Sequence, residues 1–346
     1  MSDTNTDTGT GTATGPGAHP AGQIVEVVVP AAERARLAGE LDAQAARFPE
    51  LTDPELLAEA AGLGQCLPVE ARRALTELRY GESCAGVVVR HGPVADDPGP
   101  TPRHWRESAG RPTDRFDRWL LWLAAQLGDP LCWASIQDGR LVADVLPVAG
   151  QEEAQTGHGS AAELAFHVED AFHEARCDAL ALACLRNPDA VPTTVASVTA
   201  LDLAALDVET LLEPRFRIAP DPEHLRDLPA GAAPDPLLGA VLSGPPAAPC
   251  LRVDPAFTTV PAGDRRAAAA FDALCAQLAA GLVDVALHAG DVLLLDNHRA
   301  VHGRRPFRAR YDGTDRWLRK ITVNRDLRRT RALRRSATSR VLHPFG

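Results

Sequence analysis

The clearest strand pattern in this chain is GDVLLLDNHRAVHGRRPFRARYDGTDRWLRKITV, residues 290–323. Its apolar run, VLLL at 292–295, is bounded by aspartates and is typical of a buried strand. The segment RWLRKITV at 316–323 has the same character and follows Asp312-Gly313, a strong turn signal. This part of the chain is therefore predicted to form a strand, a loop and a returning antiparallel strand.

Working outward from this segment, the chain divides into a helix-rich N-terminal part and a strand-rich remainder. From Cys132 onward, short apolar runs broken by Gly, Pro and Asp favour β-structure. Upstream, the patterns predict strands at 24–29 and 85–90 and helices at 31–48, 54–63, 68–79 and 114–127. A further helix is expected over 262–287. The fold class expected is mostly β with flanking helices (α+β), in a single domain over residues 23–346.

Two segments stand apart from this pattern. Residues 1–22 are rich in Thr, Gly and Pro, and they are predicted to form a disordered tail because they have too little apolar surface to bury. Residues 213–249 are proline-rich and irregular, and they are too long for an ordinary connection. They are predicted to form a lid or a binding loop.

Composition and charge exclude several classes of protein. The 346 residues carry a net charge of −10 and contain no apolar run long enough to cross a membrane. The N-terminus lacks the basic and apolar regions of a secretory signal. The seven cysteines form no C-x-x-C pair and do not resemble a disulfide framework. We therefore expect a cytoplasmic protein without a membrane partner, and the sequence leaves its oligomeric state open.

Basic residues gather at the C-terminus, where residues 304–346 hold 14 of the chain's 36 lysines and arginines and only three acidic residues. Such a cluster is compatible with a nucleic-acid surface. The rest of the chain is acidic, however, and aromatic residues are few in this segment. An arginine face paired within the protein is the better interpretation, so no nucleic-acid partner is expected.

The segment FHVED, residues 166–170, holds the first residues of a candidate metal site. In a strand, His167 and Glu169 point to the same face, so that an imidazole and a carboxylate grip one ion. His302, which follows the strand at 292–295, would complete a set of two histidines and one carboxylate, the pattern typical of non-haem Fe(II) oxygenases. By themselves, these residues also fit ordinary, partly buried histidines.

Arg316 favours the metal site over ordinary, partly buried histidines. It follows His302 by fourteen residues, across the turn at 311–315, and a returning antiparallel strand would bring it back toward the metal. A planar guanidinium is suited to bidentate capture of a carboxylate. An open-sided Fe(II) beside a carboxylate clamp is the arrangement that 2-oxoglutarate requires.

Five motifs resemble the clavaminate-synthase-like Fe(II)/2-oxoglutarate oxygenases, and within them most closely the free L-arginine hydroxylases of viomycin and streptothricin biosynthesis. The resemblance covers residues from about 101 to 342 in patches. Its motifs are WASIQDGRLVADVLPV (133–148), HVEDAFHEARCDALALACLRNPDAVPTTVAS (167–197), EPRFRIAPD (213–221), LRVDPAFTTVP (251–261) and GDVLLLDNHRAVHGRRPFRARYDGTDRWLRK (290–320).

The resemblance implies a double-stranded β-helix (jelly-roll) core and a 2-oxoglutarate-dependent dioxygenase. It makes His167, Glu169 and His302 the ligands of Fe(II), with 2-oxoglutarate and O₂ as co-substrates. Arg316 would bind the 2-oxoglutarate, and Thr194 would place a hydroxyl against it, although Thr193 could serve instead. No catalytic residue beyond the metal ligands is implied.

For the substrate, the resemblance implies four contacts. Gln137 would meet the α-amino group, Asp221 and Asp254 would accept hydrogen bonds from a cationic side chain, and Lys320 would bind the α-carboxylate. Related enzymes have arginine at the last position. Lys320 is the chain's single lysine among 36 basic residues, and an ammonium cannot form the two-point fork of a guanidinium.

The resemblance thus implies hydroxylation of a free cationic amino acid, with L-arginine first, at C3 or C4, in antibiotic biosynthesis. The chain departs from the viomycin-type pattern at Ala256, where those enzymes have a second acid, so ornithine, citrulline, lysine and a cyclic guanidino amino acid stay open. An asparagine-type hydroxylase and a desaturase on the same scaffold also stay open. Outside enzymes, the competing interpretation is a silent jelly-roll that binds an acidic partner.

Overall fold

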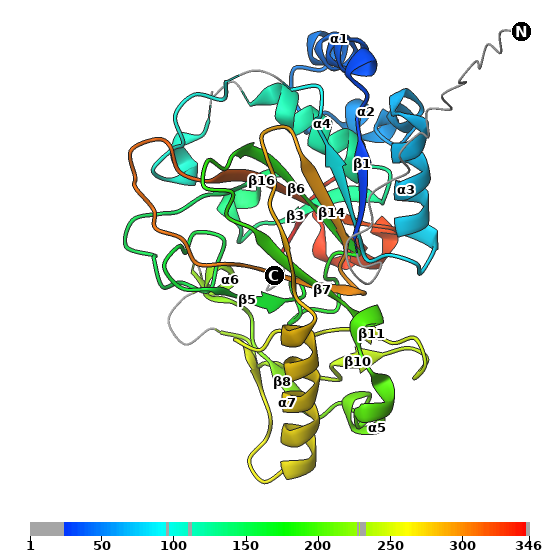
Figure 1. The fold of residues 1–346 in the computed structure, drawn as a ribbon, viewed down its shortest axis with the longest axis vertical. Coiled ribbons are helices and arrows are strands. Elements are labelled where there is room, and N and C mark those ends of the chain that lie inside the picture. Colours follow the sequence, from blue (N-terminus) through cyan, green and yellow to red (C-terminus); the bar gives the residue numbers. More distant parts are fainter. Residues whose placement is uncertain (1–23, 95–96, 110–112, 227, 229–232, 344–346) are drawn as a thin grey trace, which may run out of the picture.

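The fold of this protein, seen in a computed structural model, consists of two facing β-sheets with helices on their outer sides (Figure 1). The structure describes residues 24–343 except 95–96, 110–112, 227 and 229–232. The predicted disordered tail, 1–22, lies outside the described residues. The predicted α+β class, mostly strands with flanking helices, is confirmed.

The larger sheet supplies one wall of the core. Its strand order is β1 (Ile24–Val28), β2 (Gly86–Arg90), β14 (Val292–Asp296), β6 (Ala179–Arg186), β16 (Trp317–Asn324), β3 (Asp129–Trp133) and β17 (Val341–Leu342), and β4 (Ala143–Val145) also pairs with β16. The smaller sheet faces it with the order β13 (Val283–Val285), β7 (Thr193–Ser197), β15 (Ala300–Arg304) and β5 (Leu164–His167).

Apolar side chains from both sheets fill the space between them. Leu182, Leu293 and Leu318 of the larger sheet belong to the same buried cluster as Val195 and Ala300 of the smaller one. Because side chains alternate along a strand, the remaining residues of each strand point to the outer faces. Two sheets that share one core in this way form the sandwich expected of a jelly-roll.

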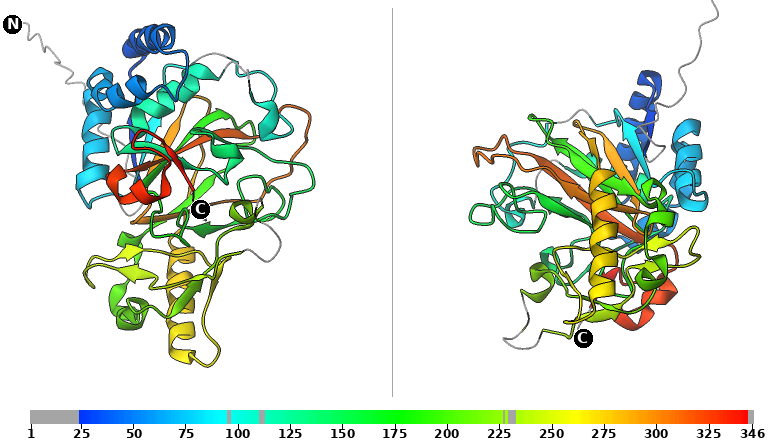
Figure 2. Two further views of the ribbon diagram at one scale, coloured as in Figure 1. Left: turned by 180° about the vertical axis from the view of Figure 1, so that it is seen from behind. Right: turned by 60° about the horizontal axis from the view of Figure 1, so that its bottom comes forward.

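Helices cover both outer faces (Figures 1 and 2). Against the larger sheet pack α1 (Ala31–Arg47), α2 (Pro54–Glu59), α3 (Val69–Tyr80) and α4 (Asp114–Ala124). Against the smaller sheet packs α7 (Arg265–Ala280). The four N-terminal helices lie where the sequence predicts them, although α2 is shorter than predicted. The buried tryptophans Trp119 and Trp122 anchor α4 to the larger sheet.

The predicted lid segment, 213–249, is only partly irregular. It holds β8 (Phe216–Ile218), the short helix α6 (Pro222–Leu225), β9 (Leu237–Gly239) and β10 (Leu242–Ser243). Strand β8 pairs with β9 and with β12 (Thr258–Thr259), and β10 pairs with β11 (Cys250–Leu251). The other short elements are α5 (Val208–Leu211) and the 3₁₀ turns 62–66, 105–107, 137–139, 198–200, 203–205 and 327–333.

Two predicted elements near the C-terminus differ from the structure. The helix expected over 262–287 ends at Ala280, because Gly281 caps it and residues 283–285 instead pair with β7 as strand β13. The segment between the two expected strands is not wholly a loop, since Ala300–Arg304 forms β15. Strands β14 and β16 therefore form no hairpin; both pair with β6, and β15 crosses to the other sheet.

The basic C-terminal segment is paired within the protein, as predicted. Arg310 pairs with Asp189, Arg325 with Asp296, and Arg340 with Asp129, at N–O distances of 2.7–3.1 Å. Partners so distant in sequence hold the C-terminal segment against the rest of the fold. No helix within the described ranges has the length and apolarity needed to cross a membrane.

Candidate active site

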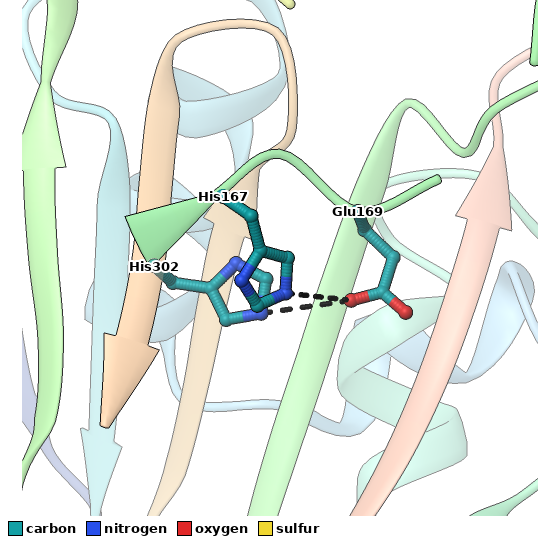
Figure 3. A group of neighbouring side chains, drawn as sticks. All are labelled: His167, Glu169 and His302. Carbon is teal, nitrogen blue, oxygen red and sulfur yellow. Dashed lines mark ion pairs between the residues drawn. The ribbon is translucent and has the colours of Figure 1, made fainter. Parts of the chain in front are cut away.

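Two strands of the smaller sheet and the turn after one of them bring the predicted metal ligands together. His302 of β15 lies directly opposite His167, the last residue of β5, and Glu169 follows two residues later. Glu169 Oε2 lies 3.9 Å from Nε2 of His167 and 3.6 Å from Nε2 of His302 (Figure 3). One ligand atom from each residue lies within 4.8 Å of the other two. The predicted trio is therefore assembled in space.

The protonation states of the trio suit a divalent metal. Nδ1 of His167 lies 2.9 Å from the Ala165 carbonyl oxygen, which only accepts, so Nδ1 carries the proton and Nε2 is free to bind. Burial lowers the pKa of His302 to about 3 and keeps its imidazole neutral. Burial alone would raise the pKa of Glu169, but the Lys320 ammonium, with smaller effects from the two histidines, outweighs it and lowers that pKa to about 2.

Glu169 is held on both its backbone and its side chain. Its N–H donates to Oδ1 of Asn297 at 2.8 Å, and Nδ2 of Asn297 donates to its carbonyl at 3.0 Å. Its Oε1 accepts a hydrogen bond from Nζ of Lys320. Oε2 is thus the oxygen that faces the two imidazoles. Such hydrogen bonds from outside a ligand set fix its orientation.

The turn after Glu169 is fixed by residues that the sequence did not reveal. Asp170 has a left-handed backbone, with φ of 54°, which is uncommon outside glycine. Its carboxylate accepts from Nε1 of Trp133 at 2.7 Å and lies 3.2 Å from Nε2 of His224, in helix α6. His224 also lies 2.8 Å from Oγ of Ser135. The only local signal was Asp-Pro at 221–222, which is typical of a helix start.

One cavity of about 970 Å³, including its opening, contains this site. Seven of the nine predicted site residues line it: His167, Glu169, His302, Arg316, Asp221, Asp254 and Lys320. Arg316, Leu318 and Lys320 all line this cavity. Leu318 belongs to the core between the sheets, and alternation along β16 carries Lys320 to the same face. Arg316 directly precedes β16, next to a register shift between Trp317 and Leu318.

Arg316 provides a buried anion site. Its Nη2 donates to Oγ1 of Thr193 at 3.1 Å, whereas its Nε has no hydrogen-bond partner within the described part of the chain. Burial lowers its pKa to about 10, a value at which it is still protonated at neutral pH. A buried cation with an unused donor fits a carboxylate ligand such as that of 2-oxoglutarate.

Thr193, the second threonine considered from the sequence, takes the place predicted for Thr194. Thr193 lines the cavity and contacts Arg316, while Thr194 lies opposite Gly303, where an added Cβ would come 2.9 Å from its hydroxyl oxygen. The next residues explain the difference, because Val195 belongs to the inner cluster and Ala196 to the outer one. Odd-numbered residues of β7 therefore face the cavity, which favours Thr193 over Thr194, and a contact of either threonine with 2-oxoglutarate stays a prediction.

The two predicted acids line the cavity with one oxygen each engaged by the backbone. Asp221 Oδ1 accepts from the N–H groups of Glu223 and His224, at 2.8 and 3.3 Å, as the N-cap of α6. Asp254 Oδ1 accepts from the N–H of Ala256 at 3.2 Å. Burial raises the pKa of both carboxyls, as expected of acids without a cation bound between them.

Gln137 is the predicted contact that the structure orients elsewhere. Its side-chain amide is paired with the backbone of Asp144, donating at 2.7 Å and accepting at 2.8 Å. Its neighbour Ile136 lines the cavity instead. The left-handed backbone of Gln137 and Asp138, with φ of 46° and 59°, produces this arrangement. A contact with a substrate amino group stays a prediction for this residue.

Comparison with known proteins gives consistent matches. Residues 134–322 match the family model described as taurine catabolism dioxygenase TauD, TfdA family. An L-ornithine/L-arginine 3-hydroxylase of Catenulispora acidiphila is 39% identical over 322 residues, which cover 86% of this chain and 94% of the relative. Enduracididine beta-hydroxylase of Streptomyces hygroscopicus is 40% identical over 321 residues, covering 86% and 93%.

Solved structures of the non-heme iron oxygenase OrfP match the whole fold. The structure with Fe and alpha-ketoglutaric acid has a TM-score of 0.83 and 41% identity, and the one with Fe, succinate and (3S)-hydroxy-L-Arg has a TM-score of 0.85 and 39% identity. Each match covers 92% of this chain and 99% of the other. The predicted resemblance is thereby confirmed.

Proposed function

Because this chain belongs to the TauD/TfdA dioxygenase family, we propose that it hydroxylates a free cationic amino acid, with L-arginine as the first candidate, in a reaction that depends on Fe(II) and 2-oxoglutarate. One observation carries the proposal. The metal trio, Arg316 and the acids Asp221 and Asp254 line the same cavity, and Nε of Arg316 has no partner among the described residues. The site therefore offers separate places for a metal, an anionic co-substrate and a cationic side chain.

Each residue has a distinct part in this proposal. His167, Glu169 and His302 hold Fe(II), and the metal with 2-oxoglutarate and O₂ supplies the oxidising chemistry when bound. Arg316 pairs with the distal carboxylate of 2-oxoglutarate, and the Thr193 hydroxyl supports the guanidinium. Three protein ligands leave part of the coordination sphere free for the co-substrates.

The substrate contacts follow from charge. Asp254 has a second oxygen available for a guanidinium, which has five N–H donors. The second oxygen of Asp221 lies 3.8 Å from Nε2 of His224 and would be shared between that ring and the guanidinium. Lys320 supplies a positive charge for the α-carboxylate, close to Glu169. A substrate held at both ends presents its middle carbons, C3 or C4, to the metal. The protein's contribution is to orient that carbon and to exclude water.

The wider proposal concerns the chain as a whole. Residues 23–346 act as one domain, and residues 213–249 serve as its lid, which is consistent with the cavity-lining positions of Ala219, Asp221 and His224. A cytoplasmic location belongs to the same proposal, since free amino acids and 2-oxoglutarate are available there. A role in antibiotic biosynthesis also belongs to it.

A cyclic guanidino amino acid is the second candidate substrate. Ala256 and Phe257 line the cavity just beyond Asp254, and the small alanine leaves room where a longer acid would stand. The relative that is 40% identical is named for enduracididine. This pair of observations supports a ring-bearing substrate as the second candidate.

The proposal is tested by incubating the protein with Fe(II), 2-oxoglutarate, ascorbate and O₂ and a panel of free amino acids. The panel contains arginine, enduracididine, ornithine, citrulline, lysine and asparagine. We expect succinate and a product heavier by one oxygen atom with arginine or enduracididine. Turnover of asparagine alone, or no turnover of any of these amino acids, would contradict the proposal. The His302→Ala variant serves as the inactive control.

A further inference from the structure

A second buried arginine lies at the Arg316 end of the cavity. Arg304, on β15, is 3% exposed, Arg316 is 6% exposed, and both line the cavity. Arg304 lies directly opposite Thr193 of β7, whose hydroxyl accepts the hydrogen bond from Nη2 of Arg316. Within the described ranges, no carboxylate lies within 4.0 Å of either guanidinium. Two positive charges are thus buried together without a counterion from those residues.

The hydrogen bonds of Arg304 do not neutralise its charge. Its Nε donates to the carbonyl of Arg305 at 3.2 Å, its Nη2 donates to the carbonyl of Ala162 at 2.8 Å, and its Nη1 donates to the carbonyl of Gly159. The ring of Phe307 lies 5.2 Å from its Cζ. Carbonyls satisfy the donors but carry no net charge. A buried charge without a partner is costly, so this arrangement fits a site that gains its anion from a ligand.

The contacts of Arg304 also exclude a simple surface role. The carbonyls that it binds belong to residues 159 and 162, which precede strand β5 and its metal-trio residue His167. Gln155, Thr156 and Gly157, slightly earlier in the same segment, line the cavity. Arg304 therefore fixes part of the cavity wall, and its buried positive charge lies in that wall. Its contacts with the wall and its place opposite Thr193 put Arg304 at the same end of the cavity as Arg316.

We propose that Arg304 is a second cationic determinant of co-substrate binding, a positioning residue whose charge, together with the direct partner Arg316, selects a dianionic 2-oxo acid over a monoanionic one. This inference rests on the proposed function. 2-Oxoglutarate has a distal carboxylate, whereas 2-oxopentanoate has the same chain length without it. Arg304 favours the former because two guanidinium charges lower the energy of the distal carboxylate in a poorly solvated place.

The test compares the binding of these two ligands rather than turnover. Protein loaded with Mn(II), which replaces Fe(II) without oxidation, is titrated calorimetrically with 2-oxoglutarate and with 2-oxopentanoate. The quantity of interest is the ratio of the two dissociation constants. We expect Arg304→Gln to lower the preference for 2-oxoglutarate by about 10- to 100-fold and to change the 2-oxopentanoate affinity by less than about 3-fold.

A charge-retaining variant separates charge from structure. Arg304→Lys loses the planar set of carbonyl bonds but keeps the positive charge, so the preference is expected to stay within about 3-fold of the unmodified protein. The matched control is Arg310→Gln, which removes an exposed arginine paired with Asp189 from the loop that follows β15. It is expected to leave the preference unchanged. If Arg304→Gln does not fold, Arg304→Met, which also removes the charge, takes its place in the comparison.

The outcomes distinguish this inference from the proposed function. An equal loss of affinity for both ligands in Arg304→Gln would assign Arg304 a purely structural role and overturn the inference, as would a preference in Arg304→Lys that falls as far as in Arg304→Gln. A preference unchanged in Arg304→Gln would overturn it as well. If the unmodified protein bound neither 2-oxo acid, the proposed function itself would fail.

Discussion

The double replacement of Asp221 and Asp254 by asparagine tests how the cavity selects its substrate. Asparagine has nearly the same size as aspartate and retains the oxygen that accepts from the backbone. The N-cap of α6 at residue 221 and the turn bond to the Ala256 N–H are therefore expected to persist. The change removes two negative charges and little else.

The expected loss of kcat/KM for arginine follows from the number of carboxylate oxygens that a guanidinium can reach. Each carboxylate has one oxygen without a backbone partner, enough for one charge-assisted hydrogen bond to a guanidinium. Such a bond contributes about 1.5–3 kcal/mol, which corresponds to a roughly 10- to 150-fold loss of kcat/KM for arginine per residue. Because the two acids interact electrostatically, the double variant is expected to lose somewhat less than the product of the two.

The assay measures succinate release and oxygenated product for arginine and for asparagine, a neutral amino acid. The double variant should lose nearly all arginine turnover and keep any asparagine turnover within about 3-fold. The reasoning would be refuted if arginine kcat/KM stayed within about 3-fold of the unmodified protein. It would also be refuted if both amino acids lost activity equally.

Further predictions concern pH, stability, the lone lysine and the metal. Burial raises the pKa of Asp221 and Asp254, so both acids take up protons at a higher pH than ordinary aspartates. The kcat/KM for arginine should therefore fall as the pH is lowered and these two carboxylates become protonated. The double asparagine variant should not show this fall. Burial alone would raise the pKa of Asp178, but the hydrogen bonds from His298 and from the Arg325 N–H outweigh it and lower that pKa to about 2. Asp178→Asn should therefore lower the unfolding free energy at pH 7 by about 2 kcal/mol. Urea titrations should show this difference fading as the pH falls from about 4 to 2. Lys320→Arg should change the apparent affinity for the amino acid and the position of hydroxylation, and identical values by mass spectrometry and kinetics would remove Lys320 from the substrate site. Saturation of the trio with Mn(II) at 100 times its dissociation constant should raise the unfolding free energy by about 2.7 kcal/mol, an increase that Glu169→Ala should abolish in a thermal melt.

The candidate metal trio could be predicted because two of its residues are close in sequence and the third follows a strongly apolar strand. The H-x-E pattern keeps two ligands close along the chain, although β5 ends at His167, so that the turn after the strand and not strand alternation places Glu169. His302 was found because it closely follows the apolar run that forms β14. Arg316 reached the expected cavity by a different route from the one predicted, since β15 and β16 belong to facing sheets and do not form a hairpin.

The errors arose where both faces of an element are buried or where its partners are distant. All five residues of β7 are buried, so polarity did not reveal which of Thr193 and Thr194 faces the cavity. Strand β13 has only three residues and exists because it pairs with β7, far away in sequence. The roles of His224 and Arg304 depend on tertiary contacts with residues 170 and 159–162, for which the sequence has no local signal.

The most direct test of the central claim is an anaerobic titration of the protein with Fe(II) and 2-oxoglutarate, followed by visible absorption. The predicted result is a metal-to-ligand charge-transfer band that saturates at one equivalent of each. The band should be lost in His302→Ala, and in Arg316→Met it should require a much higher concentration of 2-oxoglutarate. No band with the unmodified protein, or an undiminished band in His302→Ala, would contradict the assignment of this cavity as an Fe(II)/2-oxoglutarate site.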